Sequence, residues 1–165
     1  MQLASGVEWA THACTVMALL QDDEGLSAEA LAEYFGVPGP YLAKQLQALR
    51  RAGVVASVRG KRGGYRLART VDQITLLDIV RAIEGPEPAF RCTEIRRNGP
   101  CGLKPADCRR PCEIAAAFAG AEAAYREALA ARTLAAIMLE AAMNATPEHL
   151  VDMAAWVARR TGRAT

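Results

Sequence analysis

Apolar residues recur at helical spacing through the first third of the chain. Residues 3–20 place apolar side chains every three or four positions and predict a helix. After a polar break, Ser27 is suited to cap a short helix that Gly36 ends. A Val-Pro-Gly turn leads to a further predicted helix between Pro40 and Gly53, with its leucines facing inward.

Two short strands are predicted next, joined by a flexible basic loop. Residues 54–58 are β-branched and apolar, and residues 65–67 alternate between inward and outward positions. The glycine-rich segment 59–64 between them predicts a hairpin loop, and a helix over 74–83 follows. Helix, short helix, turn, helix and β-hairpin, in this order, are typical of a winged helix-turn-helix. The expected fold class is mainly α with a small β-hairpin.

The pattern changes in the second half of the chain. Residues 86–111 contain five prolines and predict a loop. An alanine-rich helix of roughly 48 Å is expected from Cys112 to Met143. The predicted organisation is a DNA-binding domain over 1–85, a cysteine-rich loop over 86–111, a long dimerisation helix over 112–145, and a C-terminal helix over 146–165 without an assigned role.

The long helix carries a heptad-like apolar seam, which predicts a homodimer. Such a helix is too long for one small winged domain to cover, so we expect it to pack against its twofold mate. The alternative is a helix buried within one subunit. The seam consists of Ile114, Phe118, Ala121, Tyr125 and Ala128.

Charge adds a candidate partner. The formal net charge of the 165 residues is only +2, yet the segment from Lys44 to Arg69 holds eight basic residues and no acidic one. This basic stripe is typical of a phosphate-binding surface and predicts double-stranded DNA as the partner. The predicted homodimer would present two recognition helices, so we expect a DNA site with two-fold symmetry. The alternative is a solvated basic face. The candidate DNA-contacting residues are Tyr41, Lys44, Gln45, Gln47, Arg51, Arg59, Lys61 and Arg62.

The distribution of apolar residues also indicates the cellular compartment. The sequence shows neither a cationic start followed by an apolar run nor an apolar stretch of about 20 residues. We therefore expect a cytoplasmic protein that does not bind membranes, in which thiols stay reduced.

Four cysteines fall within 21 residues, whereas Cys14 lies on the apolar face of the first predicted helix. In a reducing compartment this grouping favours metal, cluster or redox chemistry over structural disulfides. The spacing C-x8-C-x6-C-x3-C lacks the CxxC of a zinc ribbon. The four grouped residues are Cys92, Cys101, Cys108 and Cys112.

Several strings of the sequence resemble the IscR/NsrR/RsrR-type bacterial regulators. They lie at residues 41–49, 51–55, 57–65, 74–80 and 83–85. The resemblance extends from residue 1 to about residue 140. It implies homodimeric transcription factors, many of which hold an iron–sulfur cluster that tunes DNA binding.

The cysteine loop is most similar to the RsrR-like branch. This resemblance is carried by residues 90–96 and by Cys108 and Cys112, which precede the long predicted helix. It implies a 2Fe–2S cluster held by Cys92 and Cys112 of one subunit together with Glu8 and His12 of the other, one helical turn apart. Ligation that includes Cys101 or Cys108, or that uses cysteine alone, is the less favoured alternative.

These features together predict a homodimeric transcription regulator that senses redox state through a 2Fe–2S cluster bridging the subunits. Two alternatives stay open: a zinc- or thiol-based regulator without a cluster, and an iron–sulfur electron-transfer or carrier protein. The sequence shows no nucleophile elbow, P-loop or convincing acid–base pair, so an enzyme is not expected.

Overall fold

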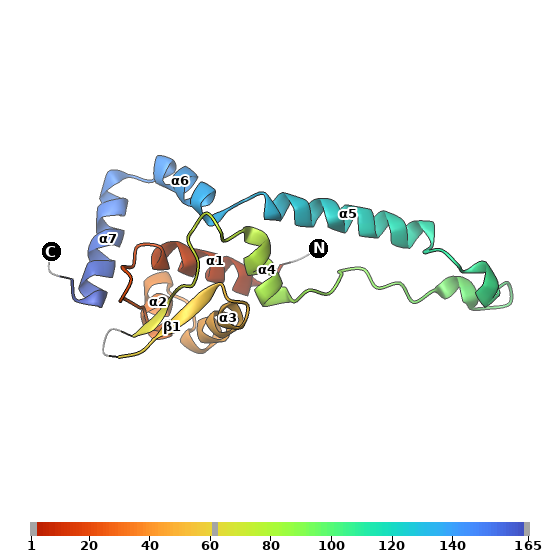
Figure 1. The fold of residues 1–165 in the computed structure, drawn as a ribbon, viewed down its shortest axis with the longest axis horizontal. Coiled ribbons are helices and arrows are strands. Elements are labelled where there is room, and N and C mark those ends of the chain that lie inside the picture. The colour runs from red at the N-terminus through yellow and green to blue at the C-terminus, as the bar shows by residue number, and fades with distance from the viewer. Residues whose placement is uncertain (1–2, 61–62, 164–165) are drawn as a thin grey trace.

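The first three helices form the helix-turn-helix. The structure is a computed structural model that describes residues 3–60 and 63–163 (Figure 1). In it, α1 covers Ser5–Met17, α2 covers Ala28–Phe35 and α3 covers Gly39–Arg51. The fold confirms the predicted mainly α architecture with a winged helix-turn-helix.

The predicted boundaries of α2 rest on local chemistry. The Ser27 hydroxyl accepts a hydrogen bond from the Ala30 N–H at 3.1 Å and so caps the helix. Gly36 ends the helix with φ of 63°, a left-handed conformation that glycine adopts at low cost. These two residues set the length of the helix before the turn into α3.

The wing is a two-stranded antiparallel hairpin of β1 (Val55–Val58) and β2 (Gly64–Leu67). Its second strand is fixed to the segment before α2, because Tyr65 and Leu26 exchange backbone hydrogen bonds at 2.7 and 3.0 Å. Gly64 makes this approach possible: a Cβ there would lie 2.3 Å from the Leu26 carbonyl.

The core lies between α1, α2, α3 and the wing. The three inward leucines predicted for α3, Leu42, Leu46 and Leu49, are fully buried. Cys14 is also fully buried, as expected for a thiol that acts as a small apolar side chain. α4 (Leu76–Glu84) closes this domain and begins with a capping box at Thr75.

An arm, defined here as residues 86–130, projects from this core (Figure 1). It contains the cysteine-rich segment and α5 (Glu113–Ala130), which run side by side. Phe90 stacks on Phe118 with ring centroids 4.4 Å apart, and the Ala89 N–H donates to Glu122 at 3.0 Å. The segment is a loop as predicted, with two short 3-10 helices, η1 (Ile95–Arg97) and η2 (Pro105–Asp107).

The prediction of one continuous helix from Cys112 to Met143 is wrong. α5 ends at Ala130, and α6 (Leu134–Asn144) begins after Thr133, whose hydroxyl caps it. The break is caused by pairing with the segment before α4. The Leu76 N–H donates to Arg132 at 2.9 Å, and the Leu134 N–H donates to Ile74 at 2.8 Å.

The last helix, α7 (Pro147–Thr161), packs back onto the core. Its Trp156 ring lies 4.7 Å from that of Tyr34 in α2. Just beyond the helix, Arg163 forms an ion pair with the buried Glu24 at 2.8 Å. The predicted helix is therefore present, and its position gives it a structural role: it covers α2.

Candidate DNA-binding surface and cysteine arm

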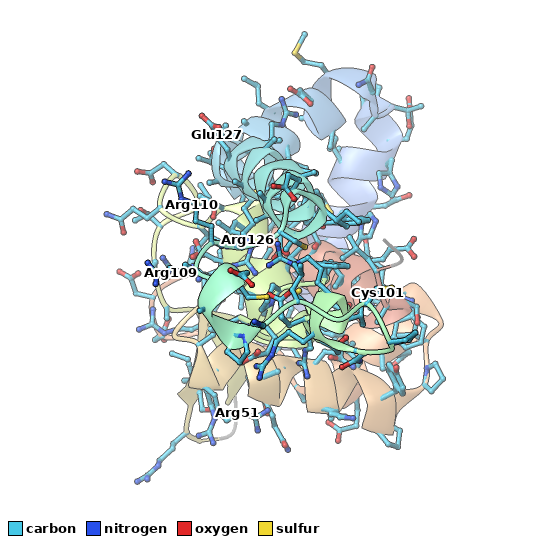
Figure 2. All side chains as sticks on the ribbon, turned by 90° about the vertical axis from the view of Figure 1, so that its right-hand side faces the viewer. Arg51, Cys101, Arg109, Arg110, Arg126 and Glu127 are labelled. Carbon is cyan, nitrogen blue, oxygen red and sulfur yellow. The ribbon has the colours of Figure 1, made fainter. Side chains whose placement is uncertain are left out.

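The basic stripe lies on α3 and the wing. Lys44, Gln47, Arg51 and Arg59 are all exposed, as is Tyr41 at 44%. Figure 2 shows Arg51 projecting from the outer edge of the helix-turn-helix. The other two candidates on the wing, at positions 61 and 62, lie outside the described residues. The exposed members together give a polar and cationic face suited to phosphates and base edges.

Gln45 was predicted to contact DNA from the exposed side of α3, and this placement is wrong, because the residue is only 6% exposed. It packs against α1 at Gly6, where a Cβ would lie 2.7 Å from the Gln45 side-chain carbonyl carbon. The helical period alone does not show that α1 passes close enough to cover this side of α3. Gly6 is thus a structurally important residue that sequence patterning missed.

A second contact joins α1 to the start of the recognition helix. The rings of Trp9 and Tyr41 meet edge to face, with centroids 5.2 Å apart. Trp9 lies between Glu8 and His12 on α1, the two residues proposed as cluster ligands. Any displacement of this part of α1 would therefore act directly on Tyr41.

Glu8 and His12 lie on an accessible face of α1. Both are exposed, and they line a shallow hollow of about 250 Å³ with Trp9, Phe35 and Val37. The His12 ring lies 5.7 Å from the ring of Phe35. This hollow offers a carboxylate and an imidazole at one edge of an apolar surface.

The predicted thiol ligands lie on the arm. The Sγ atom of Cys92 accepts a hydrogen bond from the Glu94 N–H at 3.4 Å. The Sγ atom of Cys112 caps α5 by accepting from the Ala115 N–H at 3.3 Å. Such bonds stabilise negative charge on sulfur, as does the N-terminal end of a helix.

The two inner cysteines are placed differently. Cys101 is exposed and Cys108 is half-buried. Figure 2 looks onto the free end of the arm, where Cys101, Arg109 and Arg110 are labelled. Within the described ranges, neither inner thiol takes part in a hydrogen bond through its sulfur.

Arg96 connects both ends of the cysteine-rich loop. Its guanidinium binds both carboxylate oxygens of Glu94, at 2.5 and 2.9 Å, and donates to the backbone carbonyl of Arg110 at 3.1 Å. The hydrogen bonds to Glu94 are the main reason that the pKa of Arg96 is raised. The charges of Glu94, Cys108 and Cys112 raise it further. The bond from Arg96 likewise lowers the pKa of Glu94.

One chain does not bring the four proposed ligands together. In the part of the chain that the structure describes, no three histidine, cysteine or acidic side chains form a group that could hold a metal. Glu8 and His12 lie on the core, while Cys92 and Cys112 lie on the arm. A site built from all four residues therefore has to draw on two subunits.

The helices between residues 3 and 60 and between residues 63 and 163 lie in the part of the chain that the structure describes. None of its helices combines the length and the apolarity that are needed to cross a bilayer.

Comparison with known proteins decides the family. The family model Rrf2, described as an iron-dependent transcriptional regulator, matches residues 3–140. This chain belongs to the Rrf2 family. A protein of Synechocystis sp. described as an HTH-type transcriptional regulator is 45% identical over 84 residues, which is 51% of this chain and 57% of that protein. The match thus spans little more than half the length of this relative.

Solved structures agree with the Rrf2 fold. IscR of T. potens is 25% identical with a TM-score of 0.62, covering 86% of this chain and 88% of that one. CymR, the global cysteine regulator of B. subtilis, has a TM-score of 0.63 at 24% identity, covering 85% and 98%.

The Rrf2 match confirms several predictions together. It confirms a transcription regulator with a DNA-binding fold, and it confirms that the chain is not an enzyme. It also confirms the resemblance to IscR-type regulators. Rrf2 membership argues against the electron-transfer alternative.

Proposed function

We propose that this Rrf2 regulator is a homodimer that binds a two-fold symmetric operator and senses redox state through a 2Fe–2S cluster shared between its subunits. In this proposal Cys92 and Cys112 of one subunit bind the cluster together with Glu8 and His12 of the partner subunit. Two dyad-related sites per dimer follow from the symmetry.

The hydrogen bonding of the thiols carries this proposal. Cys92 and Cys112 are the pair of arm cysteines whose sulfurs accept backbone N–H donors in the described ranges. Hydrogen bonds to cysteine sulfur are one of the features by which proteins set the potential of an iron–sulfur cluster. The donor set, two thiolates with an imidazole and a carboxylate, suits a cluster that is bound to protein by mixed ligands.

The apolar surface of the arm supports a second subunit. All of α5 is described, and none of its residues is buried in the single chain. Ile114 and Phe118, which belong to the predicted dimer seam, are 65% and 51% exposed in the single chain. A helix this apolar is stabilised when a twofold mate covers it. The same association would bring the partner's α1 toward the arm.

The contacts of α1 suggest how the signal reaches DNA. When bound, the cluster supplies reversible one-electron chemistry. Glu8 and His12 hold α1 to the partner's arm, and Trp9 touches Tyr41 at the start of α3. A shift of α1 would alter the separation of the paired recognition helices, and only one separation fits the operator.

The proposal is tested by anaerobic purification followed by the visible spectrum and by iron and sulfide analysis. We expect a coloured protein with two irons and two sulfides per site. Cys92→Ala and Cys112→Ala should bleach the spectrum, whereas Cys101→Ala and Cys108→Ala, as matched controls, should retain it. His12→Ala should perturb it. Loss of colour in the two controls, with an unchanged His12→Ala spectrum, would favour ligation by cysteine alone.

A thiol-based regulator without a cluster is the second candidate. It is favoured by the exposure of Cys101 and by the half-buried position of Cys108. The structural neighbour CymR is the global cysteine regulator of B. subtilis. A colourless protein that lacks iron and sulfide, and whose binding to DNA changes after thiol oxidation, would support this candidate.

A further inference from the structure

We propose that Arg96 is a positioning residue that clamps the two ends of the cysteine-rich loop and places a fixed positive charge beside the thiols. This proposal rests on the proposed cluster site. It assigns no ligand role to Arg96, because a guanidinium carries no lone pair for a metal. Its role is to hold the backbone that carries Cys92 and Cys112.

The clamp follows from three connected contacts. The Glu94 N–H donates to Cys92, the Glu94 carboxylate binds the guanidinium of Arg96, and that guanidinium donates to the carbonyl of Arg110. Arg110 is two residues before Cys112. Arg96 therefore links the segment around the first thiol to the segment that leads into the last one, across 14 residues of sequence.

The backbone conformation of Glu94 indicates that surrounding contacts hold the loop in place. Glu94 has φ of 54° and is the one non-glycine residue with a positive φ in the described ranges. A side chain with a Cβ adopts this conformation at a cost, and surrounding contacts have to maintain it. Here the two-oxygen pairing with Arg96 is the contact that holds Glu94, and a planar guanidinium is suited to that geometry.

The clamp is reinforced further along the loop. The Leu103 N–H donates to the backbone carbonyl of Arg96 at 2.8 Å. The side chain of Arg96 thus contacts Glu94 and Arg110, while its backbone carbonyl accepts a hydrogen bond from Leu103. A lysine at this position would retain the charge but would lose the two-pronged contact with Glu94.

Three variants separate the clamp from a general effect of charge. Arg96→Gln removes both the positive charge and the two-pronged contact with Glu94, whereas Arg96→Lys removes only the two-pronged contact. Arg97→Gln is the matched control at the next position, which is exposed. The first measurement is the rate of cluster loss to a chelator in the purified dimer. We expect about ten-fold faster loss in Arg96→Gln and faster loss in Arg96→Lys, the usual scale for residues that orient ligands, and no change in Arg97→Gln.

The second measurement is the midpoint potential, which a purely structural role would leave unchanged. Reduction adds negative charge, so the loss of a nearby cation should lower the potential in Arg96→Gln, whereas Arg96→Lys should retain the parent value. Wild-type cluster loss and an unchanged potential in Arg96→Gln would overturn the proposal, as would equal effects in Arg97→Gln.

Hydrogen exchange of the cluster-free protein separates this proposal from the cluster itself. We expect faster amide exchange over residues 94–110 in Arg96→Gln than in the parent and in Arg97→Gln. A parent protein without iron or sulfide would refute the proposed function, and the exchange result would still decide whether the clamp exists. Unchanged exchange would refute the clamp.

Discussion

The winged core and the arm differ in what covers their apolar side chains. In the core, Leu42, Leu46 and Leu49 of α3 are fully buried by elements of the same chain. On the arm, Ile114 is 65% exposed, and Phe118 is still 51% exposed although one face of its ring stacks on Phe90. The core thus buries its apolar side chains within one chain, whereas the arm leaves apolar surface exposed that the proposed twofold mate would cover.

The two regions also differ in what fixes their backbone. The core is secured by close packing, the wing hairpin and capped helices. The arm depends on a few polar contacts, such as those of Arg96 with Glu94 and of Arg126 with Glu122. Both pairs are half-buried, and ion pairs that stay accessible to water contribute little stability by themselves. The geometry of the arm is therefore the part of the molecule most open to influence by a partner subunit or a bound cofactor.

The largest effect is expected from a cavity in the core. Leu46→Ala should lower the free energy of unfolding by about 2–5 kcal/mol, because the buried side chain leaves a space that the neighbours fill only in part. Urea unfolding followed by circular dichroism measures the change. Leu103→Ala on the exposed arm loop is the control and should change stability by less than about 0.5 kcal/mol. An equal loss of stability in both variants would contradict the difference in packing between the core and the arm.

A charge on the seam of α5 should separate the subunits and leave the core folded. Phe118→Asp would place a carboxylate against the twofold mate, where an unpaired charge is strongly unfavourable. Sedimentation velocity should show a monomer, while circular dichroism should show that the helices of the core, α1 to α3, stay folded. Phe118→Leu, the apolar control, should remain dimeric. A Phe118→Asp dimer with unaltered affinity would place the interface elsewhere.

The two regions should also differ in their effect on DNA affinity. Arg59→Ala on the wing should weaken operator binding by about 1–3 kcal/mol, the scale of one good contact. Arg91→Ala removes the same charge from the arm and should have little effect at matched salt. Fluorescence anisotropy at several salt concentrations measures both. Unchanged affinity in Arg59→Ala would count against a wing that contacts DNA.

The smallest effect concerns the thiols. Burial raises the pKa of Cys14 to about 12, so in the native, cluster-free protein it should resist iodoacetamide while the arm thiols react. The unfolded thiol loses its proton near pH 9, whereas the folded one keeps it, so the stability from this group is complete below that pH and falls as the pH rises toward 12. Cys14→Ala should reduce this decline in urea melts between pH 8 and pH 10.5. Native labelling of Cys14 would contradict its burial.

The sequence by itself determined the winged core, because the signals that specify it are local. The cap at Ser27, the left-handed Gly36 and the leucine spacing of α3 each act within a few residues, and the structure reproduces them. The start of α5 next to Cys112 was predicted as well, but the capping of the helix by the Cys112 sulfur became visible only in the structure.

The tertiary structure decided what depends on residues distant in sequence. The alanine-rich pattern continues through Thr133, yet the helix breaks there because backbone groups before α4 bind the chain at that point. The burial of Gln45 required the approach of α1, and the clamp at Arg96 required the loop to return to Arg110. Periodicity reports which face of a helix is apolar, but it does not report which distant backbone or side chain will meet that face.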